Sequence, residues 1–185
     1  MQATDILMSE HRVIEGVLES LEAATHQLEM GQPVRSGIFL DAADFIKGFA
    51  DGCHHRKEEN ILFIKMADCG VPVEGGPIGV MLVEHEQGRQ YTQGMRQAVE
   101  ALETGDESAR QLIISNAYGY IQLLRQHIMK EDNILFPMAE RAIPLNEHAA
   151  LVVDFKQVED AETGVCEPDK YRALADAIHK EVFDS

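Results

Sequence analysis

The decapeptide HHRKEENILF at residues 54–63 returns almost unchanged as HIMKEDNILF at residues 127–136. In both copies a histidine stands four residues before a glutamate. The two pairs are His54 with Glu58 and His127 with Glu131. Residues four apart on an α-helix lie on the same face. Each copy therefore predicts one imidazole and one carboxylate that meet at the same point, which is half of a metal site.

The repetition continues upstream of each decapeptide. A Glu-His pair ending at His11 precedes the first copy, and another ending at His85 precedes the second. The chain up to about residue 141 is therefore a tandem repeat of two helix-turn-helix units. Two such hairpins predict an all-α fold, an up-down-up-down four-helix bundle, in which facing helices commonly carry metal sites.

Apolar periodicity and the Gly and Pro breaks divide the chain into expected helices. Four bundle helices are expected at about 4–30, 36–67, 77–102 and 106–141, so the bundle domain covers residues 1–141. Residues 142–185 are expected to form a C-terminal helical extension. Its two shorter helices, at about 146–159 and 168–183, are separated by Glu162-Thr163-Gly164. This extension is expected to pack on the bundle as a cap or to make an oligomer contact, which would give a homo-oligomer.

Net charge and cysteine content limit the partners and the cellular location that are expected. The 185 residues include 32 acidic and 16 basic ones, for a net charge of −16, so nucleic acid and membrane surfaces are not expected partners. No run approaches the roughly 20 apolar residues of a membrane span, and the N-terminus has no signal-peptide pattern. Three cysteines without a CxxC spacing argue against a disulfide framework and favour a cytoplasmic location. Cys53 is expected to be a buried, inert thiol.

Four histidines fall inside apolar helical stripes: His11, His54, His85 and His127. A single histidine on a core face is usually a hydrogen-bonded structural residue. Four of them, together with two glutamates, would cost several kcal/mol each to bury without partners, and no basic residue is expected on the same faces. A bound cation is the economical explanation.

The competing interpretation is that the repeat reflects duplication alone, with the two glutamates on a solvated face. Ile61 and Ile134 argue against it, because they follow His54 and His127 by seven residues and place these histidines on the packed side. The ligand register in the second helix remains open, since His55 and Glu59 make another i, i+4 pair. Alignment of the two decapeptides selects His54 and Glu58.

Several further residues are candidates for supporting roles. Tyr120 precedes His127 by seven residues, so it is expected to face inward and either to hydrogen-bond an oxygen species at the metal or to bond a backbone group. Four side chains are candidates for orienting the ligating imidazoles or are simply solvated: Glu10, Glu15, Glu84 and His55. His26, His148 and His179 are expected at the surface or in the C-terminal cap.

The chemistry of the ligands limits the metals that are expected to bind. Imidazoles with two carboxylates suit iron, manganese, zinc or cobalt, and the lack of thiolate ligands argues against a structural zinc site of the cysteine type. Two glutamates on different helices are each able to bridge two metals. We expect two irons, each with two histidines and shared glutamate oxygens, with open positions for an exogenous ligand.

The paired His-x3-Glu blocks, the two upstream histidines and the Leu-Phe-Pro ending resemble the hemerythrin-like HHE cation-binding family. The resemblance covers about residues 4–141. It implies an up-down-up-down bundle with a non-haem di-iron centre, whose two irons are bridged by carboxylates and by an oxo or hydroxo group. Carried over by position, the implied ligands are His11, His54, Glu58, His85, His127 and Glu131.

Two departures from the oxygen-carrying members bear on function. Those proteins have a second histidine one turn after the helix-three ligand, where this chain has Arg89, and a His-x4-Asp where it has His127 and Glu131. Loss of a nitrogen ligand favours ferric iron and makes the irons more alike. The resemblance then implies catalase- or peroxidase-like redox chemistry with hydrogen peroxide, oxygen or nitric oxide. The alternatives are an O2 or NO sensor or buffer, or iron storage and donation for repair of iron centres.

Overall fold

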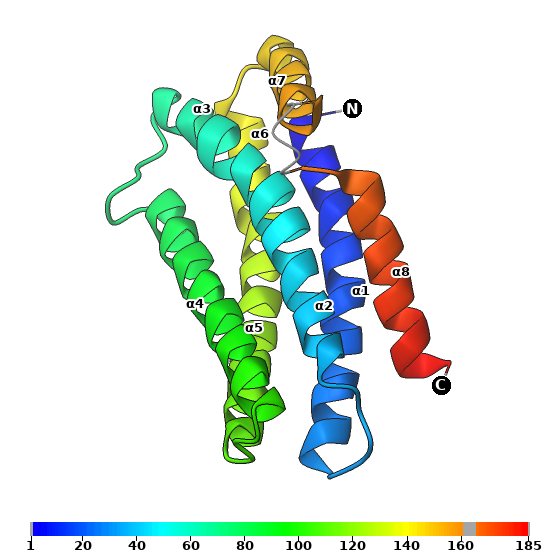
Figure 1. Ribbon diagram of the computed structural model, residues 1–185. Helices are drawn as coiled ribbons and strands as arrows, with labels where there is room; N and C mark the ends of the chain where they lie inside the picture. Colours follow the sequence, from blue (N-terminus) through cyan, green and yellow to red (C-terminus); the bar gives the residue numbers. More distant parts are fainter. Residues whose placement is uncertain (1, 161–165, 185) are drawn as a thin grey trace.

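The computed structural model describes residues 2–160 and 166–184, and every regular element in these ranges is helical (Figure 1). The elements in chain order are α1 (Ala3–Glu29), α2 (Gly37–Phe45), the π-helical segments η1 (Ile46–His55) and η2 (Glu58–Leu62), α3 (Phe63–Asp68), α4 (Pro77–Glu103), α5 (Ala109–Lys130), the π-helical segment η3 (Glu131–Leu135), α6 (Phe136–Ala142), the 3-10 turn η4 (Leu145–Glu147), α7 (His148–Asp160) and α8 (Pro168–Phe183).

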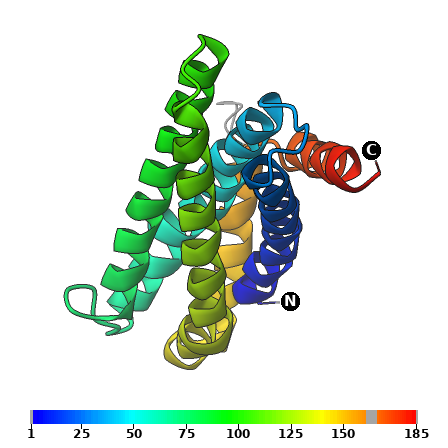
Figure 2. The same ribbon diagram turned by 90° about the horizontal axis from the view of Figure 1, so that it is seen from below.

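These elements form four long rods, which are α1, the run from α2 to α3, α4, and the run from α5 to α6. Neighbouring rods run in opposite directions, and α5 packs against both α1 and α4 (Figures 1 and 2). The predicted four-helix bundle is therefore confirmed. Short turns join the rods: Gly31 with φ 69° and Gly105 with φ 101° adopt the left-handed conformation that a residue without a Cβ tolerates best.

The interior is divided into two apolar clusters along the bundle axis. One contains Leu18, Phe49 and Ile121, and the other contains Leu62 and Leu135 near the end where α7 lies. Between these clusters lies a buried polar layer of histidines and glutamates. Apolar packing above and below the layer separates it from solvent along the bundle axis.

Two π-helical segments stand at matching places in the two repeats. Segment η2 begins at Glu58 and η3 at Glu131. A π-helical turn holds one more residue than an α-helical turn, and such turns are frequent at functional sites. The extra residue shifts the buried face, so Leu62 and Leu135 are buried while Ile134 is 52% exposed.

The expectation that Ile134 marks the packed side was therefore wrong, whereas Ile61 is half-buried and packs against the cluster that contains Leu62. The expectation assumed an uninterrupted α-helical period of 3.6 residues. The conclusion that it supported still holds, because His54 and His127 are both 1% exposed.

The C-terminal helices pack on the bundle. Helix α7 contacts α1 and η2, and α8 lies along α1 and α2 on the flank away from α4 and α5 (Figure 2). Gly48 of η1 makes this contact close, since a Cβ there would lie 1.8 Å from Tyr171 of α8. The predicted connection Glu162-Thr163-Gly164 lies outside the described residues.

Cys53 and Cys166 form a disulfide that ties η1 to the start of α8 across 113 residues of sequence. The expectations of an inert Cys53 thiol and of no disulfide were therefore wrong. An odd cysteine count permits one bond and one free thiol, here Cys69, and the spacing gave no signal because the partners meet only in the folded chain.

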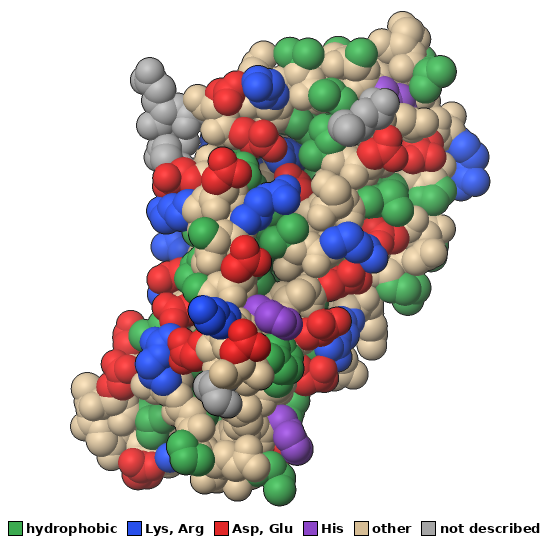
Figure 3. Space-filling view, turned by 90° about the vertical axis from the view of Figure 1, so that its right-hand side faces the viewer, with side chains coloured by type: hydrophobic (Ala, Val, Ile, Leu, Met, Phe, Trp, Pro, Cys, Tyr) green, Lys and Arg blue, Asp and Glu red, His purple; other side chains and the backbone are tan. Residues whose placement is uncertain are grey.

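The outer face of α1 and α8 shows acidic and basic side chains interspersed and histidines only as isolated spots (Figure 3). Among the described residues, none of the helices has the length and apolarity needed to cross a bilayer.

Candidate metal centre

Seven buried side chains converge in the polar layer as two groups that share Glu58. One group holds His55, Glu58, His85 and His127, and the other holds His11, His54, Glu58 and Glu131. Within each group the possible ligand atoms lie within 4.8 Å of one another. This spacing suits donor atoms arranged around a single ion, so the two groups resemble two adjacent metal positions.

The two glutamates lie between the two groups. Glu131 places one oxygen 3.2 Å from His127 Nε2 and the other 3.2 Å from His11 Nε2. Glu58 likewise places its oxygens 3.5 Å from the Nε2 atoms of His54 and His85. Each carboxylate thus faces imidazoles of both groups, which is the arrangement that bridging requires.

Every one of the five imidazoles donates its Nδ1 proton to a carboxylate behind it. The Nδ1–oxygen distances are His11–Asp132 2.6 Å, His54–Glu10 3.0 Å, His55–Asp51 2.9 Å, His85–Glu59 2.7 Å and His127–Glu84 2.9 Å. Such a bond fixes the ring orientation and the tautomer, leaving the Nε2 lone pair directed inward. All five Nε2 atoms are therefore presented as ligands.

The outer carboxylates are in turn held by basic side chains, and this shell follows the repeat. Lys57 contacts Glu10, and its counterpart Lys130 contacts Glu84. Arg89 lies 2.6 Å from Glu59, and Arg12 contacts Asp132. The shell neutralises the outer carboxylates and keeps them in place as hydrogen-bond acceptors.

Lys57 also corrects the expectation that no basic residue shares the inner faces. Its side chain is fully buried between Glu10 and Glu159 of α7, 2.5 Å from the latter. It therefore compensates an outer carboxylate, and among the described residues the ion pairs of the inner glutamates join them to histidines alone.

The inner atoms lack partners. Both oxygens of Glu58 and of Glu131, and the Nε2 atoms of His11 and His54, are buried without a hydrogen bond among the described residues. His85 and His127 bring their Nε2 atoms within 3.0 Å of each other. Two Nε2 lone pairs this close need a proton or a metal ion between them, and unpaired buried carboxylates are costly. The residues present therefore fit bound metal ions.

The pKa shifts agree with this demand for positive charge. Burial and the neighbouring imidazoles lower the pKa values of His54 and His55 well below normal, so both rings stay neutral, the form that binds metal. Burial and the adjacent Glu131 raise the pKa of Glu58. At His127 burial opposes charging, but Glu131 and Glu84 outweigh it and raise the pKa to about 9. A proton there supplies the charge that a metal would bring.

The structure brings all six predicted ligand residues together and adds His55. Because His55 joins one group, that group has three imidazoles and the other has two, unlike the expected two histidines for each iron. Glu59 lies behind His85 and does not join the inner set. The interpretation of His54 with Glu58 as one pair agrees with their convergence.

The structure places the predicted supporting residues in different surroundings. Glu10 and Glu84 each accept a bond from a converging imidazole, whereas Glu15 pairs with the exposed Arg12. Tyr120 is 1% exposed, and its hydroxyl has no partner among the described residues, so the expected alternative of a backbone bond is not observed. His148, expected at the surface or in the cap, lies buried at the start of α7.

Sequence reasoning missed Asp51, Glu59 and Asp132 as imidazole partners. The repeat carried a usable signal for two of them, because Glu59 and Asp132 occupy the same place in the two decapeptides. For Asp51 the signal was its position four residues before His55, which appears only once.

Comparison with known proteins agrees with this geometry. The chain is 24% identical over 162 residues to uncharacterized proteins of Mycobacterium bovis and Mycobacterium tuberculosis. The matched region is 88% of this chain and 63% of those proteins, so the chain spans less than two thirds of their length. No solved structure gives a significant match. The family described as the hemerythrin HHE cation binding domain matches residues 2–139, and the chain therefore belongs to this family.

Proposed function

We propose that the chain is a non-haem di-iron protein that reacts with hydrogen peroxide or oxygen in a catalase- or peroxidase-like manner. The observation that carries the proposal is the set of unpartnered Nε2 and carboxylate atoms buried between two apolar clusters. The proposed ligands are His11, His54, His55, Glu58, His85, His127 and Glu131. When bound, two irons would supply one-electron redox steps and coordination positions for a small oxidant.

The residues around the centre have separate proposed roles. Glu58 and Glu131 supply negative charge that favours ferric iron, and the five outer carboxylates hold the Nδ1 protons and orient the rings. The flanking apolar clusters exclude water along the bundle axis. Tyr120 keeps its proton, because burial raises the pKa of its hydroxyl well above the usual value. We propose that this neutral hydroxyl donates a hydrogen bond to a small oxidant that enters the site.

Chemistry on purified protein tests the proposal. Protein from iron-supplemented cells is reduced anaerobically and aerated, and peroxide is then added to the oxidised form while oxygen evolution is recorded. We expect prompt oxidation in air and peroxide consumption faster than with the same concentration of free iron. His54→Ala protein, which lacks a proposed ligand, is the matched control and is expected to lose this activity.

Other outcomes would change the assignment. A spectrum that depends on oxygen and reverses under vacuum, without peroxide turnover, would favour an oxygen-binding module. Tight nitric oxide binding with neither reaction would favour a sensor or a repair role. The cytoplasmic location stays a prediction, and the Cys53–Cys166 disulfide removes the cysteine argument for it.

A further inference from the structure

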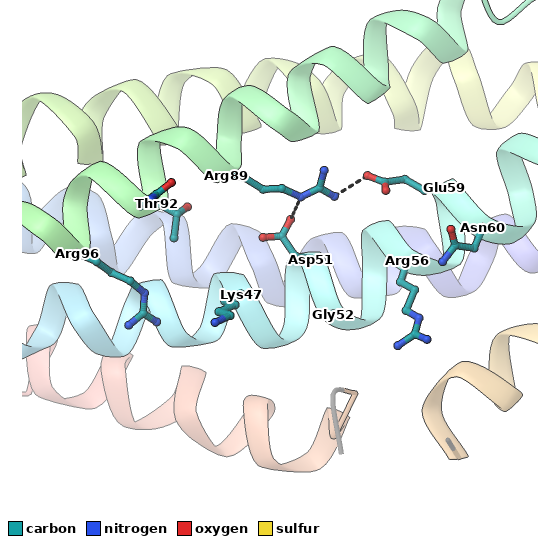
Figure 4. A pocket seen from close by; sticks show the side chains of 10 residues that line it. Lys47, Asp51, Gly52, Arg56, Glu59, Asn60, Arg89, Thr92 and Arg96 are labelled. Atoms are coloured by element: carbon teal, nitrogen blue, oxygen red, sulfur yellow. Dashed lines mark hydrogen bonds and ion pairs between the residues drawn. The ribbon is translucent and has the colours of Figure 1, made fainter. Parts of the chain in front are cut away.

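A cavity of about 640 Å³ opens between the second rod and α4, beside the metal centre. Apart from Gly52, its lining residues carry polar or charged side chains, and the apolar atoms of these side chains form much of the wall (Figure 4). The volume lies within the range of pockets that take small organic ligands. The cavity therefore has room for a molecule larger than peroxide or oxygen.

The charge of this cavity is opposite to that of the chain. Four basic side chains line it, Lys47, Arg56, Arg89 and Arg96, against the two acidic side chains Asp51 and Glu59. The whole chain, by contrast, has 16 basic against 32 acidic residues. A concave site with an excess of one sign of charge concentrates ligands of the opposite sign.

The four basic side chains differ in their partners. Arg89 is held by Asp51 and Glu59, and Arg96 pairs with Asp44. Lys47 and Arg56 have no ion-pair partner among the described residues. These two cations on η1 and just after it are therefore available to an anion that enters the cavity.

The acidic side chains connect the cavity to the metal centre. Asp51 accepts the Nδ1 proton of His55, and Glu59 accepts that of His85. Arg89 lies between α4 and η1 and contacts both carboxylates (Figure 4). The cavity is thus separated from two proposed ligands by a single layer of side chains.

We propose that this cavity binds a small organic anion that carries carboxylate or phosphate groups, attracted by Lys47 and Arg96 at one end of the cavity and by Arg56 at the other (Figure 4). A guanidinium matches the planar geometry of a carboxylate and the oxygens of a phosphate, and each can form two parallel hydrogen bonds. The site does not depend on which metal occupies the centre. Its position behind His55 and His85 makes it a place where an anionic co-substrate or effector acts on that half of the centre.

Titration calorimetry on the full metal-loaded chain tests this site, with inorganic phosphate and succinate as probes. We expect saturable binding of at least one probe to the wild type. The double variant Lys47→Gln/Arg56→Gln should weaken binding about tenfold or more, because each lost cation removes a charge-assisted hydrogen bond. Arg96→Gln should weaken it as well. Phosphate and succinate distinguish the two anion types.

The matched control is Arg141→Gln/Lys156→Gln, which removes two exposed cations outside the cavity and should leave binding unchanged. Helical circular dichroism verifies that each variant is folded. Equal binding by wild type and the cavity variants would overturn the proposal and place the anion on the metal or elsewhere. Loss of binding in the control as well would overturn it in favour of nonspecific charge attraction. No binding of either probe to the wild type would also overturn it.

Discussion

The two repeats of the bundle have the same arrangement of ligands and differ in the helical segment that leads into the first His-x3-Glu pair. Both carry a histidine followed four residues later by a glutamate, a π-helical segment that begins at that glutamate, and an outer lysine that holds a carboxylate. Among the positions at which they differ, four lie in η1 and affect the centre or its surroundings. These are Gly48, Asp51, Cys53 and His55, and the residues at the matching positions are Ile121, Leu124, Gln126 and Ile128.

The difference separates two roles: residues common to both repeats form the inner polar layer, and residues unique to the first repeat modify one side of it. The shared residues build the inner part of the polar layer, where both glutamates face imidazoles of both groups. The residues unique to the first repeat lie in η1, where they add a third imidazole to one group, bind α8 and open the cavity. The third imidazole of that group therefore originates in this one segment, while the second carboxylate of the other group, Glu131, comes from η3.

The largest effect is expected at a residue that both groups share. Glu58→Ala should reduce bound metal from about two ions per chain to nearly none, because it removes a ligand from each group and leaves imidazoles without compensation. Elemental analysis of the purified protein measures this. Glu100→Ala, in the outer part of α4, should keep both ions. Full metal content in Glu58→Ala would contradict the bridging role.

His55 tests the asymmetry directly. His55→Ala should lose or strongly weaken only the ion in the three-imidazole group, so that about one ion per chain remains, because the other group lacks His55. Ile128→Ala at the matching position of the second repeat should retain two ions. Metal content of the two variants decides the matter, and equal retention in both would remove His55 from the ligand set.

The disulfide is expected to contribute on a smaller scale. Cys166→Ser should lower the free energy of unfolding by about 2–4 kcal/mol, because the cross-link restricts the unfolded chain. Denaturant unfolding with and without reductant measures this difference. Cys69→Ser should remain as sensitive to reductant as the wild type. Wild-type stability that reductant does not change would contradict a bonded pair.

The smallest effect is expected where α8 packs on the bundle. Gly48→Ala should cost about 1–3 kcal/mol of stability, since its Cβ would collide with the Tyr171 ring. Gly16→Ala is the matched control, because nothing lies within 4 Å of its added Cβ, and it should be neutral or stabilising by up to about 1 kcal/mol. Thermal unfolding compares the two. Equal shifts would mean that α8 does not pack as described.

Much of the fold and of the centre could be predicted because the sequence pattern that forms them occurs twice. The repeated His-x3-Glu and Glu-His pairs are enough to indicate the bundle and six of the seven converging side chains. Residues that occur once were harder to interpret: His55 competed with His54 for the same role, and Cys53 gave no hint of a partner 113 residues away.

The sequence pattern also could not predict which residues after each glutamate are buried. A π-helical turn depends on local backbone hydrogen bonding, so an α-helical period misplaced Ile134 at the core. Lys57 was hidden for a related reason, because a lysine on a helix is normally assumed to be solvated.

We propose that the two ligand groups hold two irons in unequal environments. A Mössbauer spectrum of protein loaded with 57Fe tests it most directly, because each distinct iron site gives its own quadrupole doublet. The three-imidazole and two-imidazole groups predict two doublets of equal area in the wild type. A single doublet, or a spectrum of iron that is not bound to the protein, would rule out two unequal iron sites.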